Sequence, residues 1–169
     1  VALGAIPMVA LYPLMKRITW WPQVWLGLTF NWGVLVAAAA AQGQVTQADA
    51  LLYGALIFWT LGYDTIYAIQ DRVDDALISV KSTALRFGDS IKPAVTVIYV
   101  LCIALAGIAG YIAASWYGAA ATIPFALHLI QQAIRLNPTN GGLALHLFRA
   151  NREAGILLFA GWAFIAAAI

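Results

Sequence analysis

The sequence is poor in charged residues. Only 9% of them are Asp, Glu, Lys or Arg, while 63% are hydrophobic, and a soluble domain normally carries about 25% charged residues. This shortage argues against a soluble helical bundle, whose helices would show a polar face. The net charge of +2 is too small to indicate nucleic acid as a partner. The lipid bilayer is therefore the expected environment of the chain.

Cysteine and the features of a secretory leader are also scarce. Cys102 is the only cysteine, so no disulfide within the chain is possible and no redox prediction follows. The chain opens on Val1 with a short apolar run, and it shows neither the n-region nor the cleavage site of a signal peptide. We interpret the sequence as part of a longer protein.

Long apolar runs are what the sequence has in quantity. A transmembrane helix needs about 20 mainly apolar residues, and six segments approach or reach that length: 1–15, 24–41, 48–69, 94–114, 117–134 and 154–169. The pattern predicts an all-α fold, a polytopic transmembrane bundle of six helices. Nothing in the sequence indicates an internal repeat, a separate soluble domain or an oligomeric state.

The nine Lys and Arg residues occur only in three alternate connectors between these segments. The connectors follow the first, third and fifth segments and hold, in order, Lys16 and Arg17; Arg72, Lys81, Arg86 and Lys92; Arg135, Arg149 and Arg152. Cytoplasmic loops are the ones enriched in Lys and Arg. The pattern predicts one topology, with these connectors in the cytoplasm and both chain ends, Val1 and Ile169, on the far side. We expect a bacterial inner membrane.

Four of the seven acidic residues gather at the end of the third apolar segment. At about 100° per residue, Asp64, Asp71 and Asp75 project from one side of a helix. Tyr67 shares that surface, and Asp74 lies on one flank. Each Asp at the centre of a membrane helix costs about 2.5–3.5 kcal/mol on the insertion scale. We therefore expect three carboxylates aimed at a single locus in a wet cavity or at the cytoplasmic surface.

Such a cluster needs cations. Like charges about 4 Å apart repel by roughly 4 kcal/mol at an effective dielectric near 20, and a divalent ion relieves that repulsion. Mg²⁺ prefers oxygen ligands and typically uses one or two carboxylates together with substrate phosphates. Asp71 and Asp75, at i and i+4, are predicted to hold Mg²⁺ that in turn binds a diphosphate. Lys81 and Arg72 are predicted to supply positive charge to the phosphate oxygens.

The alternative interpretation is that the acidic stretch is only a solvated connector after a membrane helix. Asp74 or Asp75 would then pair with Arg72, and no ligand would be bound. Asp64, however, lies inside the apolar segment, where a solvated connector does not explain an acid. The position of Asp64 favours a functional site.

The surroundings of these acids resemble the second aspartate-rich motif of the UbiA-type intramembrane prenyltransferases. The matching stretches are YDTIYA, DRVDD and KSTA between Tyr63 and Ala84, then RFGD, YPLMKRITWWPQ at 12–23 and LFRANREAG at 147–155. The family's first motif, N-x-x-x-D-x-x-x-D, does not occur in the sequence. The resemblance implies that residues 1–169 form the C-terminal part of a single nine-helix transmembrane prenyltransferase domain. We expect this stretch by itself to be inactive.

The resemblance is strongest to family members that act in ubiquinone biosynthesis. It implies Mg²⁺-dependent transfer of a polyprenyl chain from polyprenyl diphosphate to the ring of 4-hydroxybenzoate. Catalytic roles then fall on Asp71, Asp75 and Lys81, with the two aspartates as metal ligands. We expect further residues to contact the substrates: Asp64, Tyr67, Arg72 and Arg17.

Other functions are compatible with the same residues. One is a prenyltransferase of the same superfamily with a different acceptor: a quinone precursor, haem or chlorophyll. A second is a transporter whose aspartates form an ion path, although transporters place ionisable sites near the midplane and these acids lie at the cytoplasmic end. A third is a non-catalytic scaffold, which leaves the aligned acids unexplained.

The last basic connector, 136–153, has a break rich in Pro and Gly followed by a short amphipathic helix. It is typical of a surface helix at the bilayer boundary. A functional alternative is a lid that brings Arg149 or Arg152 over the diphosphate. His128 is interpreted as a hydrogen-bonding residue between helices, and His146 as a solvated one.

Overall fold

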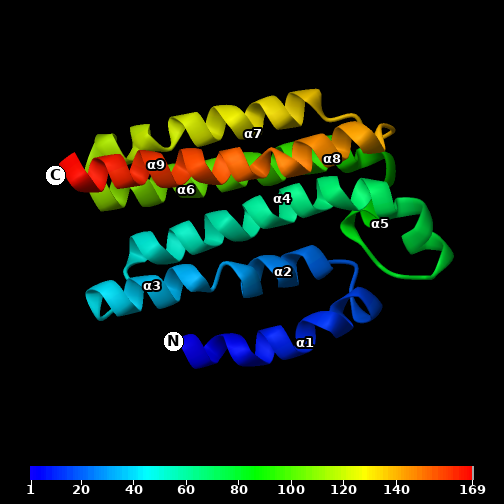
Figure 1. Ribbon diagram of the computed structural model, residues 1–169, viewed down its shortest axis with the longest axis horizontal. Helices are drawn as coiled ribbons and strands as arrows, with labels where there is room; N and C mark the ends of the chain where they lie inside the picture. Colours follow the sequence, from blue (N-terminus) through cyan, green and yellow to red (C-terminus); the bar gives the residue numbers. More distant parts are fainter. Residues whose placement is uncertain (169) are drawn as a thin grey trace.

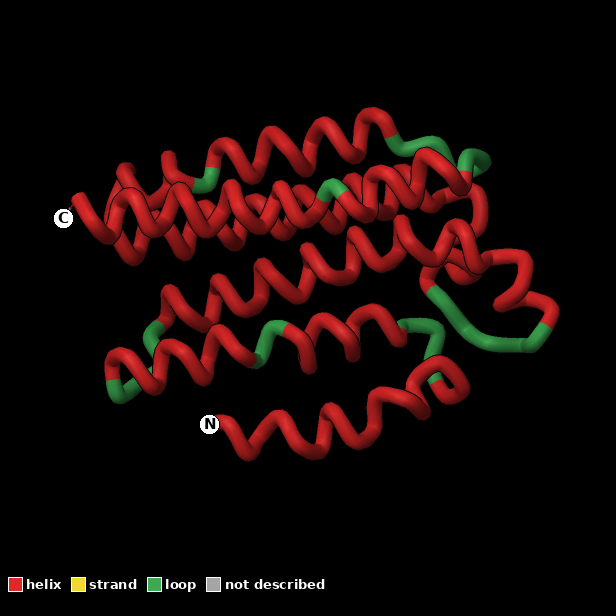
Figure 2. Tube along the Cα trace, viewed as in Figure 1, coloured by secondary structure: helices red, strands yellow, loops and turns green. Residues whose placement is uncertain are grey.

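The computed structural model describes residues 1–168, and Ile169, whose position at the far side was predicted, lies outside them. The described residues contain helices and no strands (Figures 1 and 2). Two short 3-10 helices, Ala2–Gly4 and Gly88–Ser90, accompany the α-helices. The α-helices have these bounds: α1 Ala5–Ile18, α2 Pro22–Phe30, α3 Gly33–Gln42, α4 Gln47–Leu77, α5 Thr83–Phe87, α6 Ile91–Ala121, α7 Ile123–Arg135, α8 Gly141–Arg149 and α9 Asn151–Ala168.

The helices form a bundle of six rods, which confirms the predicted all-α fold. α2 and α3 make one rod that is interrupted at Asn31 and Trp32, and α8 and α9 make another. The backbone of α6 breaks at Ala114 and Ser115, where Ser115 has a φ of 53°. This break falls between the fourth and fifth apolar segments of the sequence, so the remainder of α6 leads into α7.

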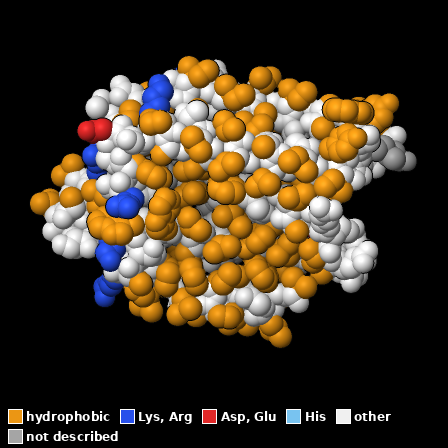
Figure 3. Space-filling model, turned by 180° about the vertical axis from the view of Figure 1, so that it is seen from behind, with side chains coloured by type: hydrophobic (Ala, Val, Ile, Leu, Met, Phe, Trp, Pro, Cys, Tyr) orange, Lys and Arg blue, Asp and Glu red, His pale blue; other side chains and the backbone are white. Residues whose placement is uncertain are grey.

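The surface of the bundle is largely apolar. Two stretches are long and apolar enough to cross a membrane by length and composition, Pro22–Gln42 and Thr83–Ala121. Figure 3 shows hydrophobic side chains over most of one face of the molecule and basic side chains gathered at one edge. Large apolar side chains such as Phe159 and Phe164 of α9 are exposed. A contiguous apolar surface of this kind marks contact with a membrane or with other protein segments.

Basic residues mark one end of the bundle, which we call the charged end. α1, α5 and α7 each carry basic residues in their last turns there: Lys16 and Arg17, Arg86, and Arg135. Val1 and the last described residues lie at the opposite end (Figure 1). The predicted placement of the described N-terminus opposite the basic connectors is therefore confirmed.

α4 is the central helix and packs against α6, α2 and α8. A Cβ atom at Gly62 would overlap the ring of Tyr99, so glycine lets α4 and α6 approach closely at that point. Small residues allow such contacts between membrane helices, where lipid provides no hydrophobic drive for association. Beyond Tyr99, the fully buried Phe125 and Leu129 of α7 fill the core.

The ends of α4 are fixed by local interactions. Thr46 and Asp49 form a capping box: Asp49 N–H donates to Thr46 Oγ1 (3.3 Å), and Thr46 N–H donates to Asp49 Oδ2 (2.8 Å). Such a cap stabilises a helix by about 1 kcal/mol. At the charged end the chain leaves the helix after Leu77 and turns at Ser79, which has a φ of 57°. Between these two ends, α4 is a single helix of 31 residues.

Candidate active site

The acidic row consists of Asp64, Asp71 and Asp75, which lie on one side of α4 within about 40° of one another. Asp75 is only 7% exposed, Asp64 and Asp71 are half-buried, and Asp74 is exposed. At 1.5 Å rise per residue, the row is about 16 Å long. Residues 1–168 contain no group of three His, Cys, Asp or Glu side chains able to hold a metal. The prediction that three carboxylates meet at one locus is therefore wrong, because the helical rise separates Asp64 from the Asp71–Asp75 pair.

The carboxylates of the acidic row form no ion pair with any described residue. Within residues 1–168 the one salt bridge joins Arg152 Nη2 to Glu153 Oε1 at 3.3 Å. A solvated connector would have paired Asp74 or Asp75 with Arg72, and the described part of the chain has no such pair. The carboxylates of the acidic row are therefore not held in direct contact with a basic side chain of the described residues.

Two neighbouring helices flank the acidic row. α2 packs against α4, and directly after its last residue Asn31 Nδ2 donates to Leu56 O (3.1 Å) and Thr60 Oγ1 (2.8 Å). Asp64 follows one turn later. On the other flank, Phe148 of α8 packs against Tyr67 with ring centroids 4.7 Å apart. Tyr67 therefore stands beside the acidic row, as predicted, with its ring fixed by α8.

Asp64 faces α1. The charges that act on it are those of Lys16, which is of opposite sign, and of Asp71. Tyr12, one turn before Lys16, is also within electrostatic reach of Asp64. The spacing of four residues between Tyr12 and Lys16 was a signal for this shared face, but sequence analysis selected Arg17. Arg17 is exposed on the last turn of α1 and makes no side-chain hydrogen bond or ion pair within residues 1–168.

Lys81 forms hydrogen bonds with α1 and none with the acidic row. Its Nζ donates to Ile18 O (3.1 Å) and lies 5.8 Å from the centre of the Trp20 ring. Its backbone N–H donates to Lys16 O (2.9 Å). A lysine in this position satisfies carbonyls at the end of a helix and interacts favourably with its dipole. Contact between Lys81 and a diphosphate stays a prediction that requires its side chain to leave Ile18.

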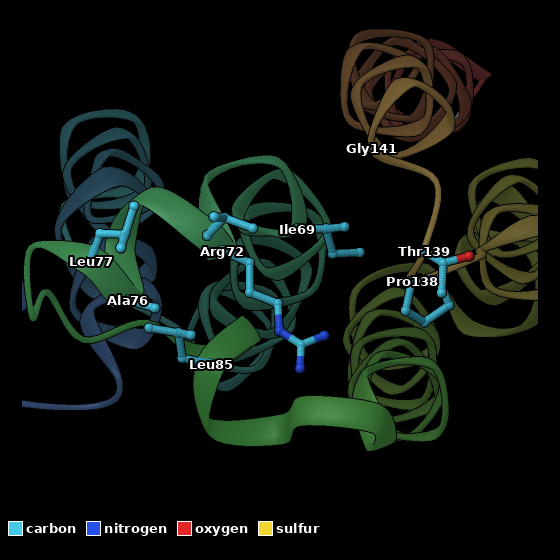
Figure 4. A pocket seen from close by; sticks show the side chains of 9 residues that line it. Ile69, Arg72, Ala76, Leu77, Leu85, Pro138, Thr139 and Gly141 are labelled. Atoms are coloured by element: carbon cyan, nitrogen blue, oxygen red, sulfur yellow. The ribbon is translucent and has the colours of Figure 1, made fainter.

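Arg72 points away from Asp71. Consecutive residues of a helix diverge by about 100°, and the Arg72 guanidinium extends into a cavity of about 640 Å³ on another side of α4 (Figure 4). That cavity is otherwise lined by apolar and small residues of α4, Leu85, and the turn at Pro138 and Thr139. The structure does not bring Arg72 together with Asp71 and Asp75.

Arg149 and Arg152 lie about halfway along α4, not in a connector. α8 and α9 are separated only by Ala150 and form one rod, and Trp59 Nε1 donates to Asn151 Oδ1 at 2.8 Å. Given the bounds of α4, Trp59 is about 18 Å from its first residue and about 27 Å from its last. The short helix expected after the break rich in Pro and Gly is present as α8, which packs along α4; its place at the bilayer boundary stays a prediction.

Asn151 holds this junction in place through a buried polar network that sequence analysis missed. Its Nδ2 donates to Leu147 O (3.0 Å), Phe148 O (3.2 Å) and Gln132 Oε1 (3.3 Å). Gln132 Oε1 also accepts from Tyr99 OH (2.9 Å). The available signal was a single amide within an otherwise helical run, since buried polar groups need partners. His128 does not show the predicted contact, as its buried Nε2 has no partner within residues 1–168.

The junction borders a pocket of about 360 Å³, which we call the mid-length pocket. Trp59 and Tyr63 of α4 line it, with rings 5.6 Å apart in an edge-to-face arrangement. The rest of its lining comes from the end of α2 and the residue after it, Phe30 and Asn31, and from Phe148, Arg149, Asn151 and Arg152 of the α8–α9 rod. No carboxylate lines it. Chemically, the acidic row suits a cation, while the mid-length pocket suits a flat apolar group that carries a negative charge.

Comparison with known proteins gives a family match and a set of similar enzymes. The UbiA prenyltransferase family matches residues 1–153. The 4-hydroxybenzoate polyprenyltransferase, mitochondrial, of Aedes aegypti is 43% identical over 95% of this chain and 37% of that protein. The human protein of the same name is 42% identical over 94% of this chain and 43% of its own length. The 4-hydroxybenzoate geranyltransferase 1 of Lithospermum erythrorhizon is 52% identical over 66% of this chain and 36% of its own. No solved structure matches.

Two facts follow from these comparisons. The chain spans about two fifths of the length of the curated relatives it matches. The animal relatives are named as mitochondrial proteins, and this overturns the expectation of a bacterial inner membrane. Lys and Arg asymmetry orients helices in a membrane, but it does not distinguish one membrane from another, so the sequence pattern gave no basis for that choice.

Proposed function

The chain belongs to the UbiA prenyltransferase family, and from this premise we propose that the protein transfers a polyprenyl chain from polyprenyl diphosphate to the ring of 4-hydroxybenzoate. The observation that carries the proposal is the acidic row on α4, whose carboxylates form no ion pair with other residues in 1–168. The names of the animal relatives support the choice of acceptor.

Prenyltransferases of this family generally use a divalent metal, and Asp71 and Asp75 suit one as two oxygen donors one turn apart. Mg²⁺ typically binds one or two carboxylates and completes its shell with water and substrate phosphates. Bound there, Mg²⁺ would supply positive charge to the departing diphosphate.

The rest of the chemistry requires positioning and exclusion of water. The allylic C–O bond breaks, and its electron pair leaves with the diphosphate. The ring carbon beside the phenol oxygen forms the new C–C bond and then loses its proton. Lys16 near Asp64, and Lys81 once released from Ile18, would add positive charge where negative charge grows in the transition state. Tyr63, Tyr67 and Phe148 form apolar walls that keep water from capturing the carbocation.

The proposal is tested by Asp71→Asn and Asp75→Asn in the full-length protein. Each change keeps the shape of the side chain but removes the charge that binds the metal. We expect Mg²⁺-dependent prenyl transfer to fall by at least about 100-fold, which corresponds to about 2.7 kcal/mol of lost transition-state stabilisation. The matched control is Asp74→Asn, because Asp74 is exposed and lies off the acidic row; we expect it to change turnover by less than about threefold.

Equal losses in all three variants would show that only the total charge of the segment matters. Unchanged turnover in Asp71→Asn and Asp75→Asn would end the metal-binding role of the acidic row. The acceptor is tested separately by offering the wild-type protein 4-hydroxybenzoate beside other aromatic acceptors, including quinone precursors. A preference for another acceptor would leave the prenyltransferase assignment intact and replace 4-hydroxybenzoate.

A further inference from the structure

A narrow groove lies between α6 and α7, which pack against each other. We call it the α6–α7 groove. Its lining includes Lys92, Thr96, Val100 and Ile103 of α6 and Ile130 and Ile134 of α7. It shares no lining residue with the mid-length pocket, and none comes from α4, which carries the acidic row. The groove is therefore distinct from the residues assigned to prenyl transfer.

The sides of the groove are apolar and open to the surroundings of the bundle. Val100, Ile130 and Ile134 are exposed, whereas Tyr99 and Ala133, which also line the groove, are buried. Exposed apolar surface of this kind contacts lipid or another protein segment. The volume of about 200 Å³ is below the range of compact small-molecule sites, about 300–1,000 Å³. The groove therefore suits a slender apolar chain rather than a ring system.

The length and direction of the groove match one leaflet of a bilayer. Lys92 and Ile103 are eleven residues apart on α6, which corresponds to about 16 Å along the helix axis. The hydrocarbon core of a bilayer is about 30 Å thick, so one leaflet contributes about 15 Å. The groove begins beside the last turn of α7, at the charged end, and runs from there towards the middle of the bundle. An acyl chain anchored at the membrane surface takes the same course.

Two cations stand where the groove reaches the charged end. The Lys92 ammonium donates to Ile134 O (2.8 Å), which leaves two of its three N–H groups for another acceptor. Arg135 follows Ile134 in the last turn of α7, is exposed, and makes no side-chain hydrogen bond or ion pair within residues 1–168. Asp89, an exposed acid three residues before Lys92, does not line the groove. This end of the groove therefore offers unused donors to an anion.

We propose that the α6–α7 groove binds one anionic phospholipid of the bilayer, with its phosphate at Lys92 and Arg135 and an acyl chain between Val100 and Ile130. Basic sites between membrane helices bind anionic lipid head groups, and cationic donors form short, strong hydrogen bonds with phosphate oxygens. Polyprenyl diphosphate is an anionic lipid too, but no carboxylate among the described lining residues could hold a metal beside its diphosphate. The inference goes beyond the proposed function and does not depend on it.

The test is lipid binding to the full-length protein in an uncharged detergent, followed by native mass spectrometry. The probes are phosphatidylglycerol and phosphatidylcholine with identical acyl chains. We expect wild type to bind phosphatidylglycerol at least about 10-fold more tightly than phosphatidylcholine. In Lys92→Gln combined with Arg135→Gln, this preference should fall below about threefold. No preference in wild type would overturn the proposal.

A matched pair of arginines separates the groove from general attraction between charges. Arg135 and Arg86 are both exposed in the last turn of a helix at the charged end, and Arg86 is outside the groove. Arg135→Gln should weaken binding of phosphatidylglycerol by at least about threefold, and Arg86→Gln by less than about 1.5-fold. Equal losses in the two variants would show that the lipid only senses the overall charge of this end, and the proposal would fail.

A second matched pair tests the acyl chain. Val100 and Val97 are similarly exposed on α6, at 57% and 59%, but only Val100 lines the groove. Val100→Trp should fill the groove and weaken binding of phosphatidylglycerol by at least about fivefold, while Val97→Trp should bind as wild type does. Thermal unfolding of both variants without added lipid checks that each is folded.

Three results would assign the groove to something else. If Val100→Trp binds phosphatidylglycerol as tightly as Val97→Trp does, no acyl chain occupies the groove. If polyprenyl diphosphate displaces phosphatidylglycerol from wild type at equal concentration, the occupant is the prenyl donor. If wild type retains no lipid and instead forms dimers that Val100→Trp disrupts, the groove is an interface between copies of the chain.

Discussion

The acidic row and the mid-length pocket share α4, but they are built in different ways. The acidic row stands on one continuous helix, so the helical rise alone sets the spacing of its carboxylates. The mid-length pocket joins three chain segments, and the hydrogen bond between Trp59 and Asn151 connects residues 92 positions apart. The acidic row therefore depends on local helical structure alone, whereas the pocket depends on tertiary contacts between distant segments. Substitutions should therefore affect the two independently.

Asn151→Leu should have the largest effect on the pocket. The amide satisfies Trp59, Gln132 and two carbonyls of α8, and leucine would leave these buried groups without partners. Each unsatisfied buried group costs about 1–3 kcal/mol, and we expect a total loss of about 3 kcal/mol. Thermal unfolding in detergent should show a midpoint lower by about 10 °C.

The control for this variant is Asn137→Ala. Asn137 lies on the exposed turn before α8, where its Oδ1 accepts from Thr139, and we expect it to lose less than about 1 kcal/mol. A comparable loss for both asparagines would mean that the buried network contributes nothing special.

The contrast between local and tertiary features also explains what the sequence could predict. Six apolar segments and the 100° stripe of Asp64, Asp71 and Asp75 depend only on neighbouring residues, and the structure contains both. The direction of Lys81 could not be predicted, because its partner Ile18 is 63 residues away. The orientation of the Arg72 side chain, which points into the cavity near Pro138, likewise depends on a distant segment.

The position of Arg149 and Arg152 along α4 could not be predicted for a related reason. The Pro and Gly residues in LNPTNGG indicated a connector, and the basic residues after them were counted with it. In the structure the helix begins at Gly141, and the rod continues through Asn151 to Ala168. Only the contacts of α8 with α4 show where along the bundle that rod begins, and no local pattern encodes them.

Trp59→Phe sharpens the comparison by removing a single donor from the pocket network. The ring contacts with Phe125, at 5.4 Å, and Tyr63, at 5.6 Å, should be largely kept. Single hydrogen bonds in membrane bundles average about 0.6 kcal/mol and reach about 1.7 kcal/mol, so we expect a loss of about 1 kcal/mol. The exposed Trp116 gives the matched control, Trp116→Phe, with a change below about 0.5 kcal/mol.

A double-mutant cycle of Trp59→Phe with Asn151→Leu tests whether these residues act together. Because each change removes the same bond, the double variant should lose less stability than the sum of the single variants, by about 1 kcal/mol. Strict additivity would show that the bond between Trp59 Nε1 and Asn151 Oδ1 does not hold the α8–α9 junction to α4.

Lys81→Gln has the smallest expected effect, and Lys92→Gln is its matched control. Both ammonium groups donate to a carbonyl at the end of a helix, Lys81 to Ile18 O (3.1 Å) and Lys92 to Ile134 O (2.8 Å). Each glutamine variant should therefore lose about 0.3–1 kcal/mol of stability.

The two lysines differ in their surroundings. Only Lys81 is bound to the end of α1 that also bears Lys16 and faces the acidic row. Only Lys81→Gln should raise the KM for polyprenyl diphosphate, by about fivefold or about 1 kcal/mol, while leaving that for the acceptor unchanged. If the two variants behave alike in donor kinetics, Lys81 is a structural tie between α1 and the loop after α4, and the positive charge near the leaving diphosphate must come from other residues.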